Sequence, residues 1–166
     1  MISFFAPGVP KPGGSKRAFV NPKTGRAIVT EDCKGNREWR AVVADCASLA
    51  MAGSPPLEGP LRVDVVFHLL RPKAHYRQNR RWFDGRQIRE SAPPHPTTRP
   101  DATKLWRAAE DSLKAICWAD DAQVVEQHVY KRYSDRSGAE IRITPLAPAS
   151  VAAESHQGLF PERIPS

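Results

Sequence analysis

Three aspartates in the middle of the chain have side chains of the type that binds a divalent metal ion. Asp101 opens a predicted helix that runs to about Cys117, and Asp120 and Asp121 follow in a turn before a predicted strand. Mg²⁺ prefers oxygen ligands and shares its coordination shell with substrate phosphate, so gathered carboxylates are typical of enzymes that cut phosphodiesters. The ion activates a water molecule and shields the charge of the phosphate. We therefore expect Asp101, Asp120 and Asp121 to be metal ligands, with Mg²⁺ as the ion and Mn²⁺ as a substitute for it.

Each of these carboxylates also has a simpler structural role. Asp101 is a favourable N-cap for the helix, and the pair Asp120-Asp121 is an ordinary composition for a turn before an apolar strand. Spacing alone does not prove a site, because a helix of about 15 residues is roughly 22 Å long and its two ends are not neighbours. Asp101 can meet Asp121 only if the following strand runs back beside the helix, or if dimerisation brings the two together.

The chain is strongly basic, with a formal net charge of +7 and a pI of about 9.7. Such an excess favours a polyanionic partner, most often nucleic acid, and a solvated basic surface is the alternative. Residues 71–100 hold eight basic and two acidic side chains, with three aromatic residues interleaved. Arginine pairs with phosphate, and aromatic rings stack on unpaired bases. We therefore predict a long basic loop that contacts DNA, including Arg80, Arg81 and Arg99, and weigh it against a solvated insertion.

The hydrophobic pattern predicts a single α/β (α+β) domain over residues 1–145, with a small mixed β-sheet packed by two main helices. Strands are expected at 2–6, 15–20, 27–29, 61–70, 124–133 and 139–144, and an amphipathic stripe at 39–50 predicts the first helix. Within the strand at 61–70, Asp64 and His68 fall on the more polar face, where they border a site or simply decorate a half-exposed sheet. Lys16 and Arg17 follow a flexible glycine pair, and either reach a phosphate or stand at a solvated strand end.

Neither a membrane span nor a signal peptide is expected, because no long apolar run and no basic start are present. The three cysteines, Cys33, Cys46 and Cys117, are far apart and lack metal-ligand spacing, so free thiols in a reducing cytoplasm are expected. Residues 146–166 are rich in Ala, Pro and Ser and are predicted to form a disordered tail. A cytoplasmic protein is the expectation.

Two stretches of the sequence resemble the motifs of a known family. The first runs from Arg99-Pro100-Asp101 through Thr103-Lys104-Leu105 to Asp111-Ser112-Leu113, and the second is Trp118-Ala119-Asp120-Asp121-Ala122-Gln123-Val124-Val125. Together they resemble the RusA family of Holliday-junction resolvases, and the Trp-x-Asp-Asp-x-Gln-Val-Val part is the more specific. The opening Gly8-Val9-Pro10-Lys11-Pro12 is similar to the start of many members of that family.

The resemblance implies a RusA-like homodimer that binds four-way DNA junctions and nicks two strands symmetrically with Mg²⁺, without a small-molecule cofactor. The family's catalytic acids fall on Asp101 and Asp121, with Asp120 beside the latter, and its essential lysine falls on Arg107. The family's second aspartate falls on Thr103, and its asparagine falls on Lys104, which we expect to contact DNA together with Lys16 and Arg17.

These departures leave two outcomes open. Thr103 cannot supply an anionic ligand, and arginine is not interchangeable with a lysine at position 107. Either Asp120 or Glu126 completes the metal site, or metal affinity is low and the protein binds junctions without cutting them well. The sequence therefore predicts a Mg²⁺-dependent, structure-selective endodeoxyribonuclease. A weakly active or inactive junction-binding protein, and a general nucleic-acid-binding module, are the alternatives.

Overall fold

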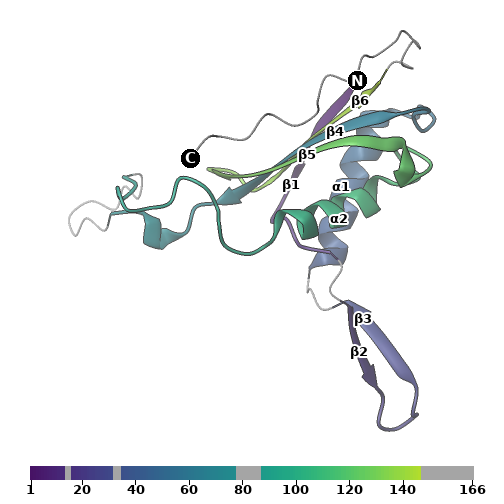
Figure 1. Ribbon diagram of the computed structural model, residues 1–166, viewed down its shortest axis with the longest axis horizontal. Helices are drawn as coiled ribbons and strands as arrows, with labels where there is room; N and C mark the ends of the chain where they lie inside the picture. The colour runs from purple at the N-terminus through teal and green to yellow at the C-terminus, as the bar shows by residue number, and fades with distance from the viewer. Residues whose placement is uncertain (14–15, 32–34, 78–86, 147–166) are drawn as a thin grey trace, which may run out of the picture.

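The computed structural model describes residues 1–13, 16–31, 35–77 and 87–146. A four-stranded mixed sheet and two helices form the body of the molecule (Figure 1). The sheet has the order β1-β6-β4-β5, with bounds β1 Ile2–Pro7, β4 Leu61–Leu70, β5 Val124–Ser134 and β6 Gly138–Pro145. The pair β4–β5 is parallel, whereas β1–β6 and β4–β6 are antiparallel. The predicted α+β class with a mixed sheet and two main helices is confirmed.

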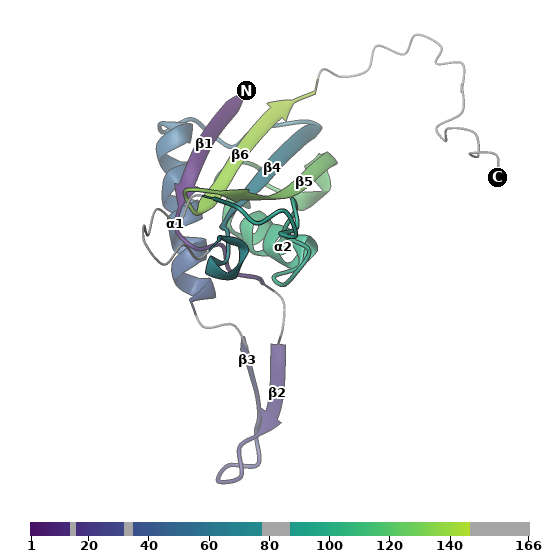
Figure 2. The same cartoon turned by 90° about the vertical axis from the view of Figure 1, so that its left-hand side faces the viewer.

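The alternation in β4 determines which face of the sheet is covered. Leu61, Val63, Val65 and Phe67 are fully buried, and the residues between them point to the other face. The buried side chains pack against helix α1 (Asn36–Met51) and helix α2 (Ala102–Leu113), which lie on the same side of the sheet (Figure 2). β1 and β5 are the two edge strands of this sheet.

Helix α2 is amphipathic and shorter than the sequence predicted. Its buried side chains recur on one face of the helix: Leu105, Trp106, Ala108, Ala109, Ser112 and Leu113. The helix ends at Leu113 rather than near Cys117, because the chain turns back to bury Trp118 completely. Ala115 adopts a left-handed conformation in this turn, with φ of 65°, and its N–H donates to the carbonyl of Trp118. Local helical periodicity could not reveal this tertiary burial.

A two-stranded hairpin projects from the body (Figures 1 and 2). It consists of β2 (Lys16–Val20) and β3 (Ala27–Glu31), which pair in an antiparallel register, as the sequence predicted. Its turn is closed by hydrogen bonds from the backbone N–H groups of Thr24 and Gly25 to the carbonyl of Asn21. The exposed turn presents Lys23 and Arg26.

The basic segment of residues 71–100 is largely irregular in the part that the structure describes, as predicted. It contains a short 3₁₀ helix, η1 (Lys73–His75), and an antiparallel bridge between Tyr76 and Ile88. Arg71 lies 4.2 Å from the ring centroid of Tyr133 and donates to the carbonyl of Pro93. These arginine contacts stabilise the segment itself, and outside η1 and this bridge the described residues of 71–100 have no helix or strand. The predicted DNA contacts Arg80 and Arg81 lie outside the described residues.

The described helices are too short or too polar for any of them to cross a membrane. Cys46 and Cys117 are free thiols, as predicted, whereas Cys33 lies outside the described residues. Burial raises the pKa of the Cys117 thiol to about 11, so this cysteine has a structural role in the core. The predicted tail, residues 146–166, lies outside the described residues apart from Leu146.

Candidate functional site

Asp101 occupies the N-cap position of α2, but its side chain does not cap the helix. Its backbone carbonyl accepts from the N–H of Leu105, at 3.0 Å, whereas its carboxylate makes no capping hydrogen bond. The side chain is 56% exposed and lies 3.7 Å from the ammonium of Lys104. The interpretation of Asp101 as a side-chain N-cap is therefore wrong, because the capping hydrogen bond is not made. The carboxylate remains available to a ligand.

The backbone around Asp101 is held by a lysine from the neighbouring edge strand. Lys131 Nζ, on β5, donates to the carbonyls of Thr98 and Pro100, at 3.0 and 2.9 Å. Charge-assisted hydrogen bonds of this kind are the stronger ones in proteins. Lys131 therefore fixes the segment that leads into Asp101, a role that the sequence did not indicate.

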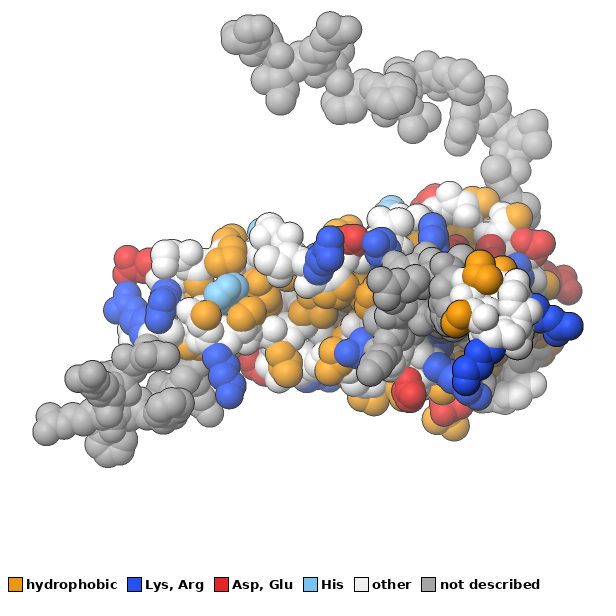
Figure 3. Space-filling model, turned by 90° about the horizontal axis from the view of Figure 1, so that it is seen from below, with side chains coloured by type: hydrophobic (Ala, Val, Ile, Leu, Met, Phe, Trp, Pro, Cys, Tyr) orange, Lys and Arg blue, Asp and Glu red, His pale blue; other side chains and the backbone are white. Residues whose placement is uncertain are grey.

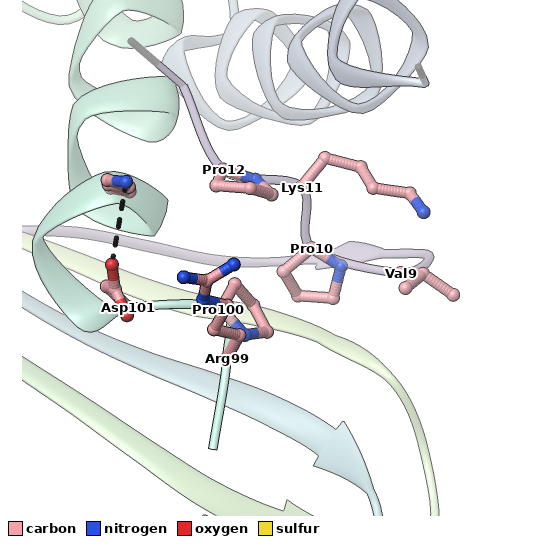
Figure 4. A pocket seen from close by; sticks show the side chains of 8 residues that line it. Val9, Pro10, Lys11, Pro12, Arg99, Pro100 and Asp101 are labelled. Carbon is pink, nitrogen blue, oxygen red and sulfur yellow. Dashed lines mark ion pairs between the residues drawn. The ribbon is translucent and has the colours of Figure 1, made fainter. Parts of the chain in front are cut away.

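Asp101 borders a pocket of about 440 Å³ (Figure 4). One wall is formed by residues 9–12 and the other by Arg99, Pro100, Asp101 and Lys104. The two walls are joined by a hydrogen bond from the N–H of Gly13 to the carbonyl of Lys104, at 2.8 Å. Three cations, Lys11, Arg99 and Lys104, thus share a pocket with one carboxylate. Such a charge balance suits an anion such as a phosphate.

Asp120 has the structural role that the sequence left open for it. It caps the short 3₁₀ helix η2 (Asp121–Gln123), because its carboxylate accepts from the N–H of Ala122 at 3.0 Å. The side chain of Gln123 completes a capping box by accepting from the N–H of Asp120. The same side chain also donates to the carbonyl of Leu57. The Asp-Asp-x-Gln pattern therefore builds a rigid turn at the start of β5.

Asp121 is held in this turn by two donors from its own chain. One carboxylate oxygen accepts from Trp118 Nε1 at 3.0 Å, and the other accepts from Lys114 Nζ at 3.1 Å. Partial burial opposes the charged form, but the hydrogen bonds from Trp118 and Lys114 outweigh it and lower the pKa of Asp121. Burial, followed by the charge of Asp121, raises the pKa of Glu110 in the last turn of α2. Asp121 is thus a fixed anion beside the carboxyl end of α2.

Asp101 and Asp121 lie at opposite ends of α2 within one chain. The helix has 12 residues, which corresponds to about 18 Å. β5 runs back beside the helix, which was one of the two arrangements expected to bring the carboxylates together. It brings Lys131 to Pro100 and leaves Asp121 at the carboxyl end of α2. Among the described residues, no three His, Cys, Asp or Glu side chains are gathered as a metal site. A single chain therefore does not unite the three predicted metal ligands.

The donor chemistry at Asp101 nevertheless fits Mg²⁺. This ion is commonly held by one or two carboxylates and completes its shell with water and substrate phosphate. The carboxylate of Asp101 is exposed and free of capping, the neighbouring Thr103 is exposed, and the pocket beside them is basic. The carboxylate oxygens of Asp121 have accepting capacity beyond the single hydrogen bond that each receives.

The remaining predicted residues lie on or before α2 and at the start of β2. Arg107 follows Lys104 by three positions on α2, and both side chains are exposed. Arg99, which precedes α2, is also exposed. Lys16 and Arg17 begin β2, and their side chains lie outside the described part of the structure. Lys and Arg side chains are spread over the face shown in Figure 3. Sequence reasoning assigned no role to Lys11, although its position between two prolines indicated a constrained lysine.

The polar residues predicted on the outer face of β4 lie beside charged side chains of the same sheet. Arg62 donates to both carboxylate oxygens of Asp64, and His128 Nδ1 lies 3.0 Å from the same carboxylate. His68 Nε2 lies 3.6 Å from Glu140. These contacts agree with the simpler interpretation, a half-exposed sheet face, rather than with a catalytic site.

Comparison with known proteins adds a family to this geometry. Residues 7–144 match the family model described as endodeoxyribonuclease RusA. A protein of Bacillus subtilis (strain 168), named uncharacterized protein YqaN, is 29% identical over 142 residues, which are 86% of this chain and 94% of that protein. The family match includes both ends of α2 and the pocket beside Asp101.

Proposed function

The chain belongs to the RusA endodeoxyribonuclease family, and from this premise we propose that it is a Mg²⁺-dependent endonuclease that resolves four-way DNA junctions by paired, symmetric nicks. The observation that carries the proposal is the carboxylate of Asp101. It is positioned by backbone contacts, makes no capping hydrogen bond and borders a basic pocket. An aspartate with a purely structural role is not expected to combine these three features. A metal ligand beside a phosphate is expected to combine them.

Asp101 and three basic side chains near the amino end of α2 have separate roles in the proposed reaction. Asp101 provides hard oxygen ligands, and a bound Mg²⁺ would supply charge stabilisation and a lowered water pKa. Arg99 and Lys104 hold the phosphate backbone in the pocket, since both are exposed cations beside Asp101. Arg107 stabilises the negative charge that develops on the phosphate, in place of the lysine that the family has there.

A homodimer would unite the carboxylates that one chain keeps apart. If two copies of α2 run antiparallel across a two-fold axis near the middle of the helix, the amino end of each lies beside the carboxyl end of the other. Asp101 of one copy then lies beside Asp120 and Asp121 of the second. The edge strand β5, which has no described strand on its outer side, contacts α2, so an interface centred on α2 could include β5. Two composite sites related by symmetry would suit paired nicks in two strands.

A weakly active or inactive junction-binding protein is the second candidate. It is favoured by Thr103, which replaces the family's second aspartate with a neutral side chain, and by Lys104, whose ammonium lies 3.7 Å from Asp101. Both residues reduce the negative charge available to a cation. They leave the basic pocket, and hence DNA binding, in place.

A synthetic four-way junction with each strand end-labelled in turn distinguishes the two candidates. We expect Mg²⁺-dependent nicks at symmetric positions in two strands, and a loss of at least about 100-fold in Asp101→Asn, or about 2.7 kcal/mol in barrier. Asp45→Asn, an exposed aspartate on α1, removes the same charge and should cut normally. Tight junction binding without nicks in Mg²⁺ or Mn²⁺ would instead establish the second candidate.

A further inference from the structure

The cations of the pocket beside Asp101 are spread along it rather than gathered at one point. In Figure 4, Asp101 lies at one end, Arg99 follows, and Lys11 extends away from Asp101 at the other end. Lys104 is paired with Asp101. In the described part of the chain, neither Lys11 nor Arg99 forms an ion pair with a carboxylate. The pocket therefore presents a row of positive charge that begins at the candidate catalytic carboxylate.

Both walls of the pocket are fixed by contacts outside it. Lys131 holds the wall that contains Arg99, through the carbonyls of Thr98 and Pro100. Gly13 fixes the opposite wall, because it packs so closely on α2 that a Cβ atom there would lie 3.1 Å from the backbone of Ala108. Preformed walls reduce the entropic cost of binding an extended ligand.

The stem of Lys11 is also held in place. Its Cε atom lies 3.3 Å from the position that a Cβ of Gly35 would take, and Gly35 has a left-handed φ of 81° before α1. Lys11 is half-buried, because a lysine can pack its methylene stem on the protein while its ammonium stays in water. A stem packed in this way delivers the ammonium to a restricted region at the end of the pocket.

We propose that this pocket is a track for the sugar–phosphate backbone of the strand that is cut, and that Lys11 contacts a phosphate next to the scissile one without a metal ion. The proposal rests on the proposed function, since it takes its substrate from there. Arg99 pairs with phosphate through a planar fork, whereas Lys11 provides a point charge. The strand would leave Asp101, pass Arg99 and continue toward residues 9–12. This path gives Lys11 a role that neither the family match nor the metal ligands assign to it.

The test combines one protein variant with single neutral linkages in the DNA. Junctions that carry one methylphosphonate at each position around the branch point and the nick are bound in EDTA, where no cutting occurs. With the wild-type protein, we expect one neutral linkage beside the cut phosphate to weaken binding. Lys11→Gln should weaken binding to the unmodified junction, lower the slope of log K against log salt by about one, and become insensitive to that one linkage.

Two matched variants identify the contact. Lys11→Arg keeps the charge and should restore sensitivity to the same linkage. Lys23→Gln removes the same charge from the hairpin turn and should keep the wild-type pattern of sensitivity at the nick. Thermal unfolding of each variant checks that the pocket wall is intact.

The proposal is overturned if no linkage beside the nick affects the wild-type protein, or if Lys11→Gln keeps the wild-type pattern. The proposed nuclease function fails separately, by an absence of nicks in Mg²⁺ and Mn²⁺. In that case, the effect of each neutral linkage around the branch point on binding still tests the proposed backbone track. The binding assay does not depend on catalysis.

Discussion

Lys131 on β5 donates a hydrogen bond of 2.9 Å to the carbonyl of Pro100, the residue before Asp101. This contact joins the edge strand of the sheet to the amino end of α2. It connects the position of the candidate catalytic carboxylate to the packing of the domain, although residues 100 and 131 are far apart in sequence.

We predict that Lys131→Met lowers the rate of nicking about ten-fold without abolishing junction binding, because Asp101 loses its fixed position. The variant also loses two hydrogen bonds from a charged donor, which corresponds to about 1 to 2 kcal/mol in the free energy of unfolding. Single-turnover nicking and urea denaturation measure the two effects. Lys23→Met, in the hairpin turn, is the control, and an unchanged nicking rate in Lys131→Met would contradict the prediction.

Replacing Lys104 with asparagine, the residue that the family has there, should strengthen metal binding. The ammonium of Lys104 lies 3.7 Å from Asp101 and competes with a metal ion for the carboxylate. Half-exposed ion pairs of this kind contribute up to about 1 kcal/mol, so the Mg²⁺ concentration for half-maximal nicking should fall by up to about five-fold.

Titration calorimetry with Mn²⁺ gives a second measurement of the Lys104 effect that does not depend on activity. Lys104→Arg keeps the charge and should leave the metal affinity close to that of the wild type. If the asparagine variant needs as much metal as the wild type, then Lys104 does not compete for Asp101.

The ion pair between Arg62 and Asp64 on the outer sheet face should contribute most to the free energy of unfolding at pH values above the ordinary pKa of an aspartate. The hydrogen bond from Arg62 is the main cause of a lowered pKa of Asp64, whose ordinary value is 3.8. Because the folded-state pKa lies below the unfolded-state value, the ionised carboxylate adds stability above about pH 3.8. This contribution is lost as the pH falls through the folded-state pKa.

Asp64→Asn should therefore be less stable than the wild type near neutral pH, by about 1 kcal/mol. The two proteins should converge as the pH falls below about 3.8, the ordinary value for an aspartate. Urea denaturation across this pH range measures the difference, with Asp45→Asn as an exposed control. A difference that stays constant with pH would show that the charge of Asp64 does not contribute.

The sequence predicted the parts of the fold that depend on local patterning. The alternation from Leu61 to Phe67 indicated the central strand and its buried face, and the apolar stripe of α2 indicated a helix after Asp101. The end of that helix was missed, because Trp118 is buried by a turn whose contacts are tertiary. Lys131 and Lys11 were missed for the same reason, since each acts on a segment far away in sequence.

For the candidate site, residue types and the resemblance identified the carboxylates but not their arrangement. Asp101, Asp120 and Asp121 are equivalent as acids. Only the structure shows that Asp120 caps a turn, that Asp121 is held by Trp118 and Lys114, and that the carboxylate of Asp101 makes no capping hydrogen bond. Periodicity also could not tell that the two ends of α2 stay apart in one chain.

This separation makes the composite site of the proposed dimer directly testable by mixing two inactive variants. Asp101→Asn and Asp121→Asn should each lose nicking when pure. In a mixed dimer, one composite site carries both substitutions, and the other keeps both aspartates. An equimolar mixture that exchanges subunits should therefore recover about a quarter of the wild-type nicking, as unpaired single nicks.

Sites built within one chain would behave differently in the same experiment. Each subunit of the mixed dimer would then carry one defect in its own site, and no activity would return on mixing. An equimolar mixture of Asp101→Asn with wild type controls for exchange, because it should convert part of the paired nicks into single ones. Failure of the two inactive variants to complement, under conditions where this control shows exchange, would exclude the composite arrangement and require a rearrangement within each chain to bring Asp121 to Asp101.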